Sequence, residues 1–268
     1  MNGILFDLDG VFYVGDQAIP GAAETLDWVR QRHIPHCFLT NTSSKSRDAL
    51  VTKLSRLGLA ADARHILTPP VAASSWIGQH LAGSIVLFVP DDTEAEFAQL
   101  DLLDRETQEP VAAVVVGDLG DGWDFTTLNQ AFRLLMQQPS PRLIALGMTR
   151  YWRAPDGLRL DVAPFVHALQ HASGITPVVL GKPSVDFYNS ALEMIGCEAE
   201  QSVMVGDDIR GDIAAAQAAG VRGLLVQAGT FQGSDLAVGI TPDGHLASIA
   251  ELPDWWAGLP GRIGLGPR

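Results

Sequence analysis

Carboxylate, hydroxyl and ammonium side chains follow four short apolar runs of this 268-residue chain. In chain order these polar residues are Asp7, Asp9, Thr40, Asn41, Lys182, Asp207, Asp208 and Asp212. Each group alone is a common turn sequence, because these residue types are favoured in turns. Together they suit phosphoryl transfer, in which positioning and charge neutralisation do most of the catalysis. The set therefore predicts chemistry on a phosphate group.

The carboxylates add a second requirement. Asp7 and Asp9 are two residues apart, and on an extended backbone such residues project to the same side. Crowding carboxylates is costly unless a cation neutralises them, and hard cations prefer oxygen ligands. A carboxylate nucleophile also splits one difficult displacement into two easier steps. We therefore expect a Mg²⁺ site and a nucleophilic aspartate.

The elements that must position these residues are short apolar runs alternating with amphipathic stretches. We predict strands within residues 3–7, 36–40, 84–89, 111–116, 143–146, 177–180, 202–205 and 223–226. We predict helices within residues 20–33, 44–57, 71–81, 125–137, 164–172, 184–195 and 209–219. Alternation of this kind indicates parallel sheets with right-handed crossovers. Ligands of such sheets bind at the carboxyl ends of the strands, which is where the polar residues stand.

Spacing between the polar residues predicts the domain organisation. Thr40 follows Asp7 by 33 residues, which is enough for one strand–helix–strand unit. Lys182 follows Thr40 by 142 residues, far more than one crossover requires. We therefore expect a catalytic core formed by residues 1–80 and 177–268, with a domain inserted at residues 81–176.

Five stretches of the chain carry a resemblance to a known family. They are Phe6–Val11, Leu39–Thr42, Leu128–Phe132, Gly181–Pro183 and Val205–Asp208. The chain resembles the haloacid dehalogenase superfamily, and within it the type IIA, NagD-like phosphatases. The resemblance implies an α/β fold, with a Rossmann-like parallel-sheet core and an inserted α/β cap domain of type II.

The resemblance also implies the roles of the catalytic and substrate-binding residues. Asp7 would be the nucleophile that forms an aspartyl-phosphate. Asp9 would protonate the leaving group and then activate water; its presence favours a competent phosphatase. Thr40, Asn41 and Lys182 would bind the phosphoryl group, with Lys182 also orienting Asp7.

A Mg²⁺ cofactor is implied by the same resemblance. Asp207 would bind the metal together with the Asp7 carboxylate and the Asp9 backbone carbonyl. Asp208 and Asp212 would support the metal. A small phosphorylated substrate and a homodimer are further implications.

The inserted domain offers one candidate for contact with the substrate. Arg150 and Arg153 flank Tyr151 and Trp152 beside a Pro-Asp-Gly turn. Two cations and two aromatic rings suit a phosphorylated ligand. The alternative is an exposed edge strand with its usual charges.

Composition excludes several classes of partner. The chain has 18 basic and 31 acidic residues and a net charge of −13, which argues against nucleic acid and anionic membranes as partners. Two distant cysteines imply no disulfide framework. No signal peptide and no bilayer-spanning run is found. We therefore expect a cytoplasmic protein.

Two alternative functions remain open. The first is a phospho-aspartate switch, which holds its phosphate instead of releasing it repeatedly. The second is a non-catalytic protein of the same fold that binds a phosphometabolite. The substrate is also open among sugar phosphates, nucleotides, small aromatic phosphates, phosphoramidates and pyrophosphate.

Overall fold

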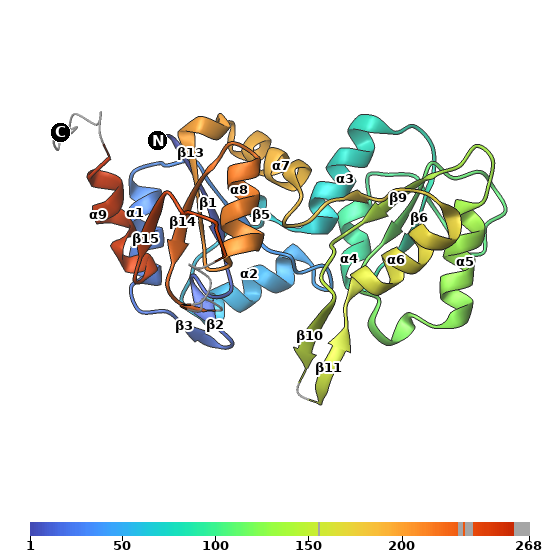
Figure 1. Ribbon diagram of the computed structural model, residues 1–268, viewed down its shortest axis with the longest axis horizontal. Coiled ribbons are helices and arrows are strands. Elements are labelled where there is room, and N and C mark those ends of the chain that lie inside the picture. Colours follow the sequence, from blue (N-terminus) through green and yellow to red (C-terminus); the bar gives the residue numbers. More distant parts are fainter. Residues whose placement is uncertain (155, 230–232, 234–237, 260–268) are drawn as a thin grey trace. The chain divides into compact units, whose positions relative to one another are not determined.

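The computed structural model describes residues 1–154, 156–229, 233 and 238–259 (Figure 1). The chain divides into two compact units. The first unit comprises Met1–Leu39, Val51–Ile66 and Ala191–Arg268, and the second comprises Thr40–Leu50 and Leu67–Ser190. Each unit contains a parallel sheet with helices (Figure 1).

A six-stranded sheet with the order β15-β14-β13-β1-β4-β5 forms the centre of the first unit. Its strands are β1 (Gly3–Asp7), β4 (His36–Leu39), β5 (Ile66–Leu67), β13 (Ser202–Gly206), β14 (Arg222–Val226) and β15 (Gly244–Leu246). Strand β1 pairs in parallel with β13 and with β4, and all its residues are buried. Burial on both faces explains its continuous apolar sequence.

Helices and a small hairpin complete the first unit and its borders. They are α1 (Ala22–Gln31), α2 (Arg47–Arg56), α7 (Val185–Ile195), α8 (Ala215–Ala218), α9 (Leu252–Ala257) and the hairpin β2 (Tyr13–Val14) with β3 (Gln17–Ala18). Phe6, Phe12 and Phe38 pack with ring centroids 5.1–5.8 Å apart in the core. Trp28 and Trp256 meet edge to face at 6.3 Å and join α1 to α9.

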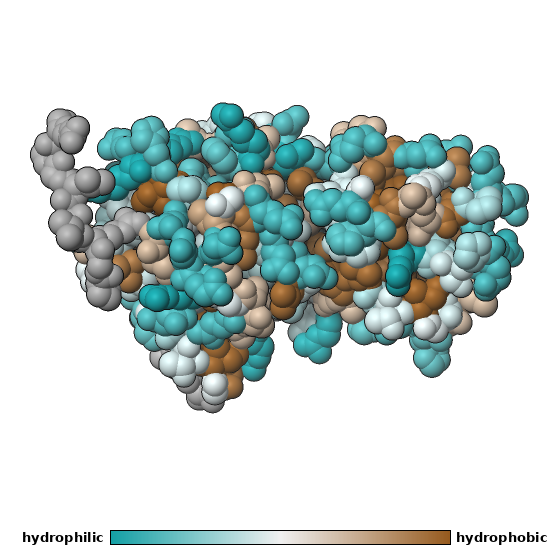
Figure 2. Space-filling view, turned by 90° about the horizontal axis from the view of Figure 1, so that it is seen from above, coloured by the Kyte–Doolittle hydropathy of each residue, from teal (hydrophilic) through white to brown (hydrophobic). Residues whose placement is uncertain are grey.

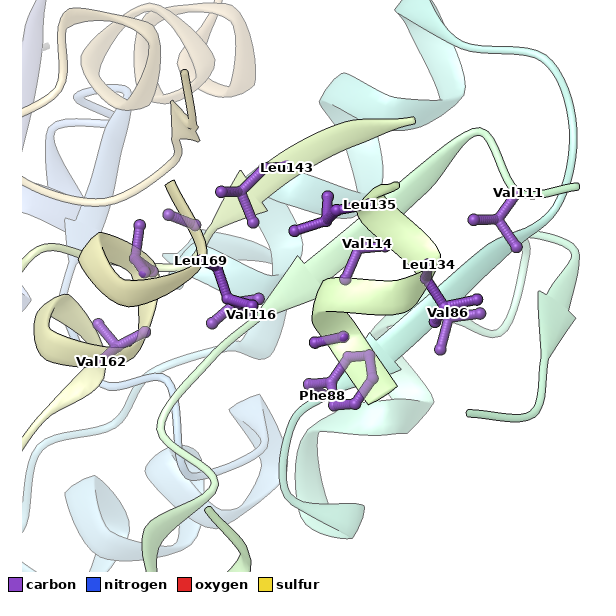
Figure 3. Packing of buried hydrophobic residues seen from close by; sticks show 13 residues of the cluster. Val86, Phe88, Val111, Val114, Val116, Leu134, Leu135, Leu143, Val162 and Leu169 are labelled. Carbon is purple, nitrogen blue, oxygen red and sulfur yellow. The ribbon is translucent and has the colours of Figure 1, made fainter. Parts of the chain in front are cut away.

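The second unit contains a five-stranded sheet with the order β12-β9-β8-β6-β7. Its strands are β6 (Ile85–Phe88), β7 (Leu102–Leu103), β8 (Ala113–Val116), β9 (Arg142–Ala145) and β12 (Val178–Val179). Its helices are α3 (Pro69–His80), α4 (Asp91–Glu94), α5 (Phe125–Leu135) and α6 (Val162–Ser173). Figure 3 shows α5 contributing Leu134 and Leu135, and α6 contributing Val162 and Leu169, to one core with the strands.

Strands β10 (Tyr151–Ala154) and β11 (Gly157–Leu160) form a separate antiparallel hairpin (Figure 1). Its face with Tyr151, Leu158 and Leu160 is largely exposed. Elsewhere, hydrophilic residues cover most of the face seen in Figure 2, with smaller apolar patches between them. No helix in the described part of the chain is long and apolar enough to cross a membrane.

The structure has a strand at each of the eight predicted positions. One helix prediction is wrong in type: residues 209–219 begin as a π-helix, η5 (Ile209–Ala214), and only then continue as α8. The N–H of Ile213 donates to the carbonyl of Asp208, five residues back, which widens this turn. Strand β12 pairs with β9 in the five-stranded sheet, so that sheet extends beyond residue 176.

A buried histidine, His36, lies in the sheet of the first unit beside a second histidine. His36, on β4, is 8% exposed; its Nδ1 lies 2.9 Å from the Ile34 carbonyl oxygen, and its ring lies 4.8 Å from that of His65. Its Nε2 has no hydrogen-bond partner among the described residues. Burial lowers the pKa of His36 and also that of His65. Burial therefore disfavours the protonated form of both rings in the folded state.

We expect the thermal unfolding midpoint to fall as the pH drops below about 6.5. The unfolded chain takes up protons near that pH, whereas the folded imidazoles resist protonation, so stability is complete above about 6.5 and declines with acidification. His36→Phe, which suits the neighbouring Phe6 and Phe38 rings, should flatten the dependence. Midpoints measured between pH 5 and 8 test this, with His171→Phe on an exposed site as control. Parallel pH curves for wild type and His36→Phe would contradict it.

Candidate functional site

Three buried carboxylates gather at the carboxyl ends of the neighbouring strands β1 and β13. Asp7 ends β1, Asp207 follows β13, and Asp212 lies on the π-helical turn η5. Their exposed fractions are 7%, 3% and 0%. One oxygen from each lies within 4.8 Å of the others. Such crowding of buried negative charge is costly without a cation, and oxygen donors of this kind fit a hard cation such as Mg²⁺.

Two glycines allow these carboxylates to approach the backbone. Gly10 has a φ of 87°, and an added Cβ there would collide with the carboxylate of Asp207. An added Cβ at Gly206 would collide with the side chain of Asp212. The sequence therefore needs glycine at both places for steric reasons, and at Gly10 also for the left-handed backbone.

Asp9 and Asp208 stand outside this group of three. Asp9 is exposed, and its backbone forms an isolated β-bridge with that of Tyr13 beyond the end of β1. Asp208 is exposed, and its carboxylate accepts from the N–H of Arg210 at 2.8 Å, which caps η5. The N–H of Asp208 donates to the Asp212 carboxylate at 3.2 Å. Asp208 thus holds the turn that carries Asp212, and its predicted support of a metal stays a prediction.

Thr40 follows Leu39, the register partner of Asp7 in the pairing of β4 with β1. It is 7% exposed. Its hydroxyl lies 2.9 Å from the Thr42 hydroxyl and accepts from the N–H of Thr42 at 3.2 Å. These contacts tighten the loop directly after β4.

Asn41 ties the Thr40 loop to Lys182. The N–H of Lys182 donates to Asn41 Oδ1 at 2.7 Å, and Asn41 Nδ2 donates to the Lys182 carbonyl at 3.0 Å. Gly181 leaves little room beside this clamp, since an added Cβ would lie 3.3 Å from Asn41 Oδ1. Lys182 itself is 8% exposed. Sequence reasoning predicted Asn41 only as a substrate-binding residue, because spacing does not reveal a contact between residues 141 positions apart.

Asn41→Ala should raise KM for phosphorylated substrates about tenfold, the scale of losing the two partly buried hydrogen bonds to Lys182. The reason is that the backbone N–H and carbonyl of Lys182 both lose their hydrogen-bond partner. The loop after β4 is then no longer attached to the segment at Lys182. Steady-state kinetics with inhibition by inorganic phosphate measure the effect. Asn41→Asp keeps an acceptor for the Lys182 N–H but loses the donor, so it should lie between wild type and Asn41→Ala. A KM for Asn41→Ala equal to that of wild type would refute the role of the clamp.

The predicted cap residues lie on or beside the hairpin β10–β11. Arg150 is exposed, with its guanidinium 5.7 Å from the centroid of the Tyr151 ring. Arg153 is on β10, and its side chain lies outside the described part of the structure. Trp152 is 43% exposed. Both readings of this segment, a ligand contact and an exposed edge strand, fit these positions.

Two half-buried carboxylates of the second unit, Asp118 and Asp161, are not among the predicted site residues. Burial raises the pKa of Asp118. Burial, and to a smaller extent the charge of Asp118, raises the pKa of Asp161. Asp118 accepts from the N–H of Gly120 at 3.1 Å, and Asp161 accepts from that of Val162 at 2.6 Å at the start of α6. These backbone contacts give both carboxylates a role in loop and helix ends.

Two family models match the chain: haloacid dehalogenase-like hydrolase at residues 4–102 and HAD-hydrolase-like at residues 179–252. The human phospholysine phosphohistidine inorganic pyrophosphate phosphatase is 39% identical over 259 residues, which cover 95% of this chain and 93% of that protein. The p-nitrophenyl phosphatase from Archaeoglobus fulgidus is 25% identical with a TM-score of 0.85, covering 95% of this chain and 98% of that one. NagD from E. coli shares the fold, with 23% identity, a TM-score of 0.84 and coverage of 94% and 98%.

Proposed function

We propose a Mg²⁺-dependent mechanism through an aspartyl-phosphate on Asp7. The premise is that the chain belongs to the haloacid dehalogenase-like hydrolases and is a NagD-like, type IIA phosphatase. The substrate is a small phosphorylated metabolite. The observation that carries the proposal is the buried group of Asp7, Asp207 and Asp212. Such a group is stabilised by a cation and leaves Asp7, at the end of β1, as the nucleophile.

The proposed reaction has two displacements. An oxygen of the Asp7 carboxylate attacks phosphorus, and the bond from phosphorus to the leaving group breaks while Asp9 donates a proton to the leaving atom. Asp9 then takes a proton from water, whose oxygen attacks the phosphorus of the aspartyl-phosphate. Inorganic phosphate leaves, and the Asp7 carboxylate and the Asp9 acid are restored.

The remaining roles in the proposal are holding the metal ion and binding the phosphoryl group. Asp7, Asp207 and Asp212 would hold Mg²⁺, with the Asp9 carbonyl and Asp208 in support. When bound, Mg²⁺ offsets the negative charge of the carboxylates and of the phosphoryl oxygens. In this proposal Thr40 donates a hydrogen bond to the phosphoryl group. Lys182 balances its charge and orients Asp7.

The names of relatives narrow the substrates worth testing. The human relative is named for phospholysine, phosphohistidine and inorganic pyrophosphate, and the Archaeoglobus relative for p-nitrophenyl phosphate. These compounds carry phosphorus on nitrogen, on a second phosphate or on an aryl oxygen. We propose that phosphoramidates and pyrophosphate stand beside phosphate monoesters as substrates of this enzyme.

The organisation of the molecule is part of the proposal. Residues 1–80 and 177–268 would act as the catalytic core, and residues 81–176 as a cap that excludes water and selects the leaving group. Strand β12, just beyond this boundary, completes the sheet of the cap. Arg150 and Arg153 would contact the substrate from the cap. Action in the cytosol is a further part of the proposal, and so is a homodimer, which the family resemblance implies.

Phosphate release from a panel of compounds tests the function. The panel contains p-nitrophenyl phosphate, pyrophosphate, a phosphoramidate and a sugar phosphate, each with Mg²⁺ and with EDTA. We expect repeated turnover with Mg²⁺ and none with EDTA. One equivalent of retained phosphate would indicate the phospho-aspartate switch instead. Binding of every compound without release would indicate the non-catalytic alternative.

A further inference from the structure

An ion pair in the second unit joins the start of α2 to the short helical turn η2 (Ala95–Phe97). Arg47 Nε lies 3.1 and 2.9 Å from the two Glu96 carboxylate oxygens, and Arg47 Nη2 lies 2.7 Å from Oε2. The N–H of Arg47 also donates to Oε1 at 3.2 Å. Glu96 therefore receives a guanidinium and the first N–H of a helix at the same time.

The surroundings distinguish this pair from the other ion pairs of the described residues. The Glu96 side chain is 9% exposed and that of Arg47 is 31% exposed. In every other such pair, at least one partner is 60% exposed or more. Exposed pairs contribute little, whereas a bidentate pair shielded from solvent is stronger and fixes geometry. A carboxylate at a helix start is also favoured by the helix dipole.

The loop between β4 and α2 is thereby held at both ends. At its beginning, Asn41 clamps the peptide of Lys182. At its end, Glu96 holds Arg47. On either side of Asn41, the hydroxyls of Thr40 and Thr42 are hydrogen-bonded to each other. The segment Thr40–Leu50 accordingly belongs to the second unit, although Leu39 and Val51 on either side belong to the first.

We propose that Arg47 and Glu96 are positioning residues of the phosphatase, which fix the loop carrying Thr40 through the start of α2. The inference rests on the proposed function, which puts Thr40 on the phosphoryl group. Neither Arg47 nor Glu96 has to touch the substrate for this role. Their contribution is to the placement of the Thr40 hydroxyl, because a displaced hydroxyl weakens or loses its hydrogen bond to the charged phosphoryl group.

Loss of the pair should therefore weaken phosphate binding more than it weakens the fold. Without Glu96, the Arg47 guanidinium and N–H lose a shared acceptor, and the end of the loop is released. KM for p-nitrophenyl phosphate and the inhibition constant of inorganic phosphate should then rise together, about tenfold or more, which is the scale of losing a hydrogen bond to a charged group. The maximal rate should change less, because Asp7 and Asp9 stand on a different segment.

The test compares Glu96→Ala, Arg47→Ala and the double variant with wild type, with Mg²⁺ present. The double variant should be no worse than either single variant, since the residues act as one unit. Asp62→Ala is the matched control: Asp62 likewise accepts from the N–H and guanidinium of an arginine, Arg64, but at an exposed site. It should leave KM within about twofold of wild type, as surface pairs contribute little. Glu96→Gln keeps one acceptor oxygen and should show an intermediate effect.

Hydrogen exchange gives a reading that does not depend on turnover. Amides of the loop at residues 40–46 should exchange faster in Glu96→Ala than in wild type or in Asp62→Ala. Unchanged exchange of these amides, or an unchanged KM and phosphate inhibition in Glu96→Ala, would overturn the inference. Failure of the proposed function is separate, because it would appear as full activity in Asp7→Asn whatever the Glu96 variants do.

Discussion

Asp7→Asn is expected to abolish phosphate release while the protein stays folded. The amide cannot attack phosphorus as a carboxylate does, so no aspartyl-phosphate forms. Loss of a group that forms the covalent intermediate lowers turnover by on the order of 10³-fold or more. Asn has the same shape as Asp, so the buried position at the end of β1 remains filled.

We also expect Asp7→Asn to be at least as stable as wild type when no metal is bound. Asp7 shares its buried position with Asp207 and Asp212, and replacing it by a neutral residue removes repulsion among the three. The unfolding midpoint in EDTA should therefore equal or exceed that of wild type. Phosphate release, mass spectrometry of the trapped enzyme and thermal unfolding are the measurements, with Asp16→Asn on the exposed β2–β3 turn as control. An Asp7→Asn protein as active as wild type would eliminate the mechanism.

Much of the three-carboxylate group could be predicted from sequence because parallel strands bring their carboxyl ends to one edge. Asp7 ends one buried strand and Asp207 follows the next, and the pairing register, Phe6 with Val205, brings the two residues within one position of each other along the neighbouring strands. The sequence did not separate Asp208 from Asp212. That choice depends on the π-helical turn η5, and an ordinary helix was predicted there. In the structure the Asp208 carboxylate caps the turn while that of Asp212 joins the group.

Contacts between distant short elements could not be predicted in this way. The Asn41 amide meets the Lys182 peptide, and Glu96 meets Arg47 across 49 positions. Neither pair leaves a periodic signal, because each involves a single residue in a loop or a short turn. Strand β12 has only two residues, and its pairing with β9 determines which of the two sheets it joins. Local patterns fix the type of an element more readily than its partner.

Mg²⁺ is expected to raise the thermal unfolding midpoint of wild type, and EDTA to abolish turnover. A ligand that binds only the folded state stabilises it by about 2.7 kcal/mol at a hundred times its Kd, or roughly 5–10 °C for a domain of this size. Asp207→Asn should lose both the shift and the activity. Without metal, its midpoint should equal or exceed that of wild type, because one of three crowded charges is gone.

Non-specific screening has to be separated from binding, since the chain carries a net charge of −13. Any salt reduces repulsion between surface carboxylates, so NaCl at equal ionic strength gives the stabilisation owed to screening alone. Specific binding is measured by how much further MgCl₂ raises the unfolding midpoint than NaCl does at equal ionic strength. This excess should be present in wild type and Asp16→Asn but missing in Asp207→Asn. An equal excess in Asp207→Asn would place the cation elsewhere. The buried carboxylates would then need another explanation for their proximity, such as a proton shared among them, which would make turnover fall as the pH rises.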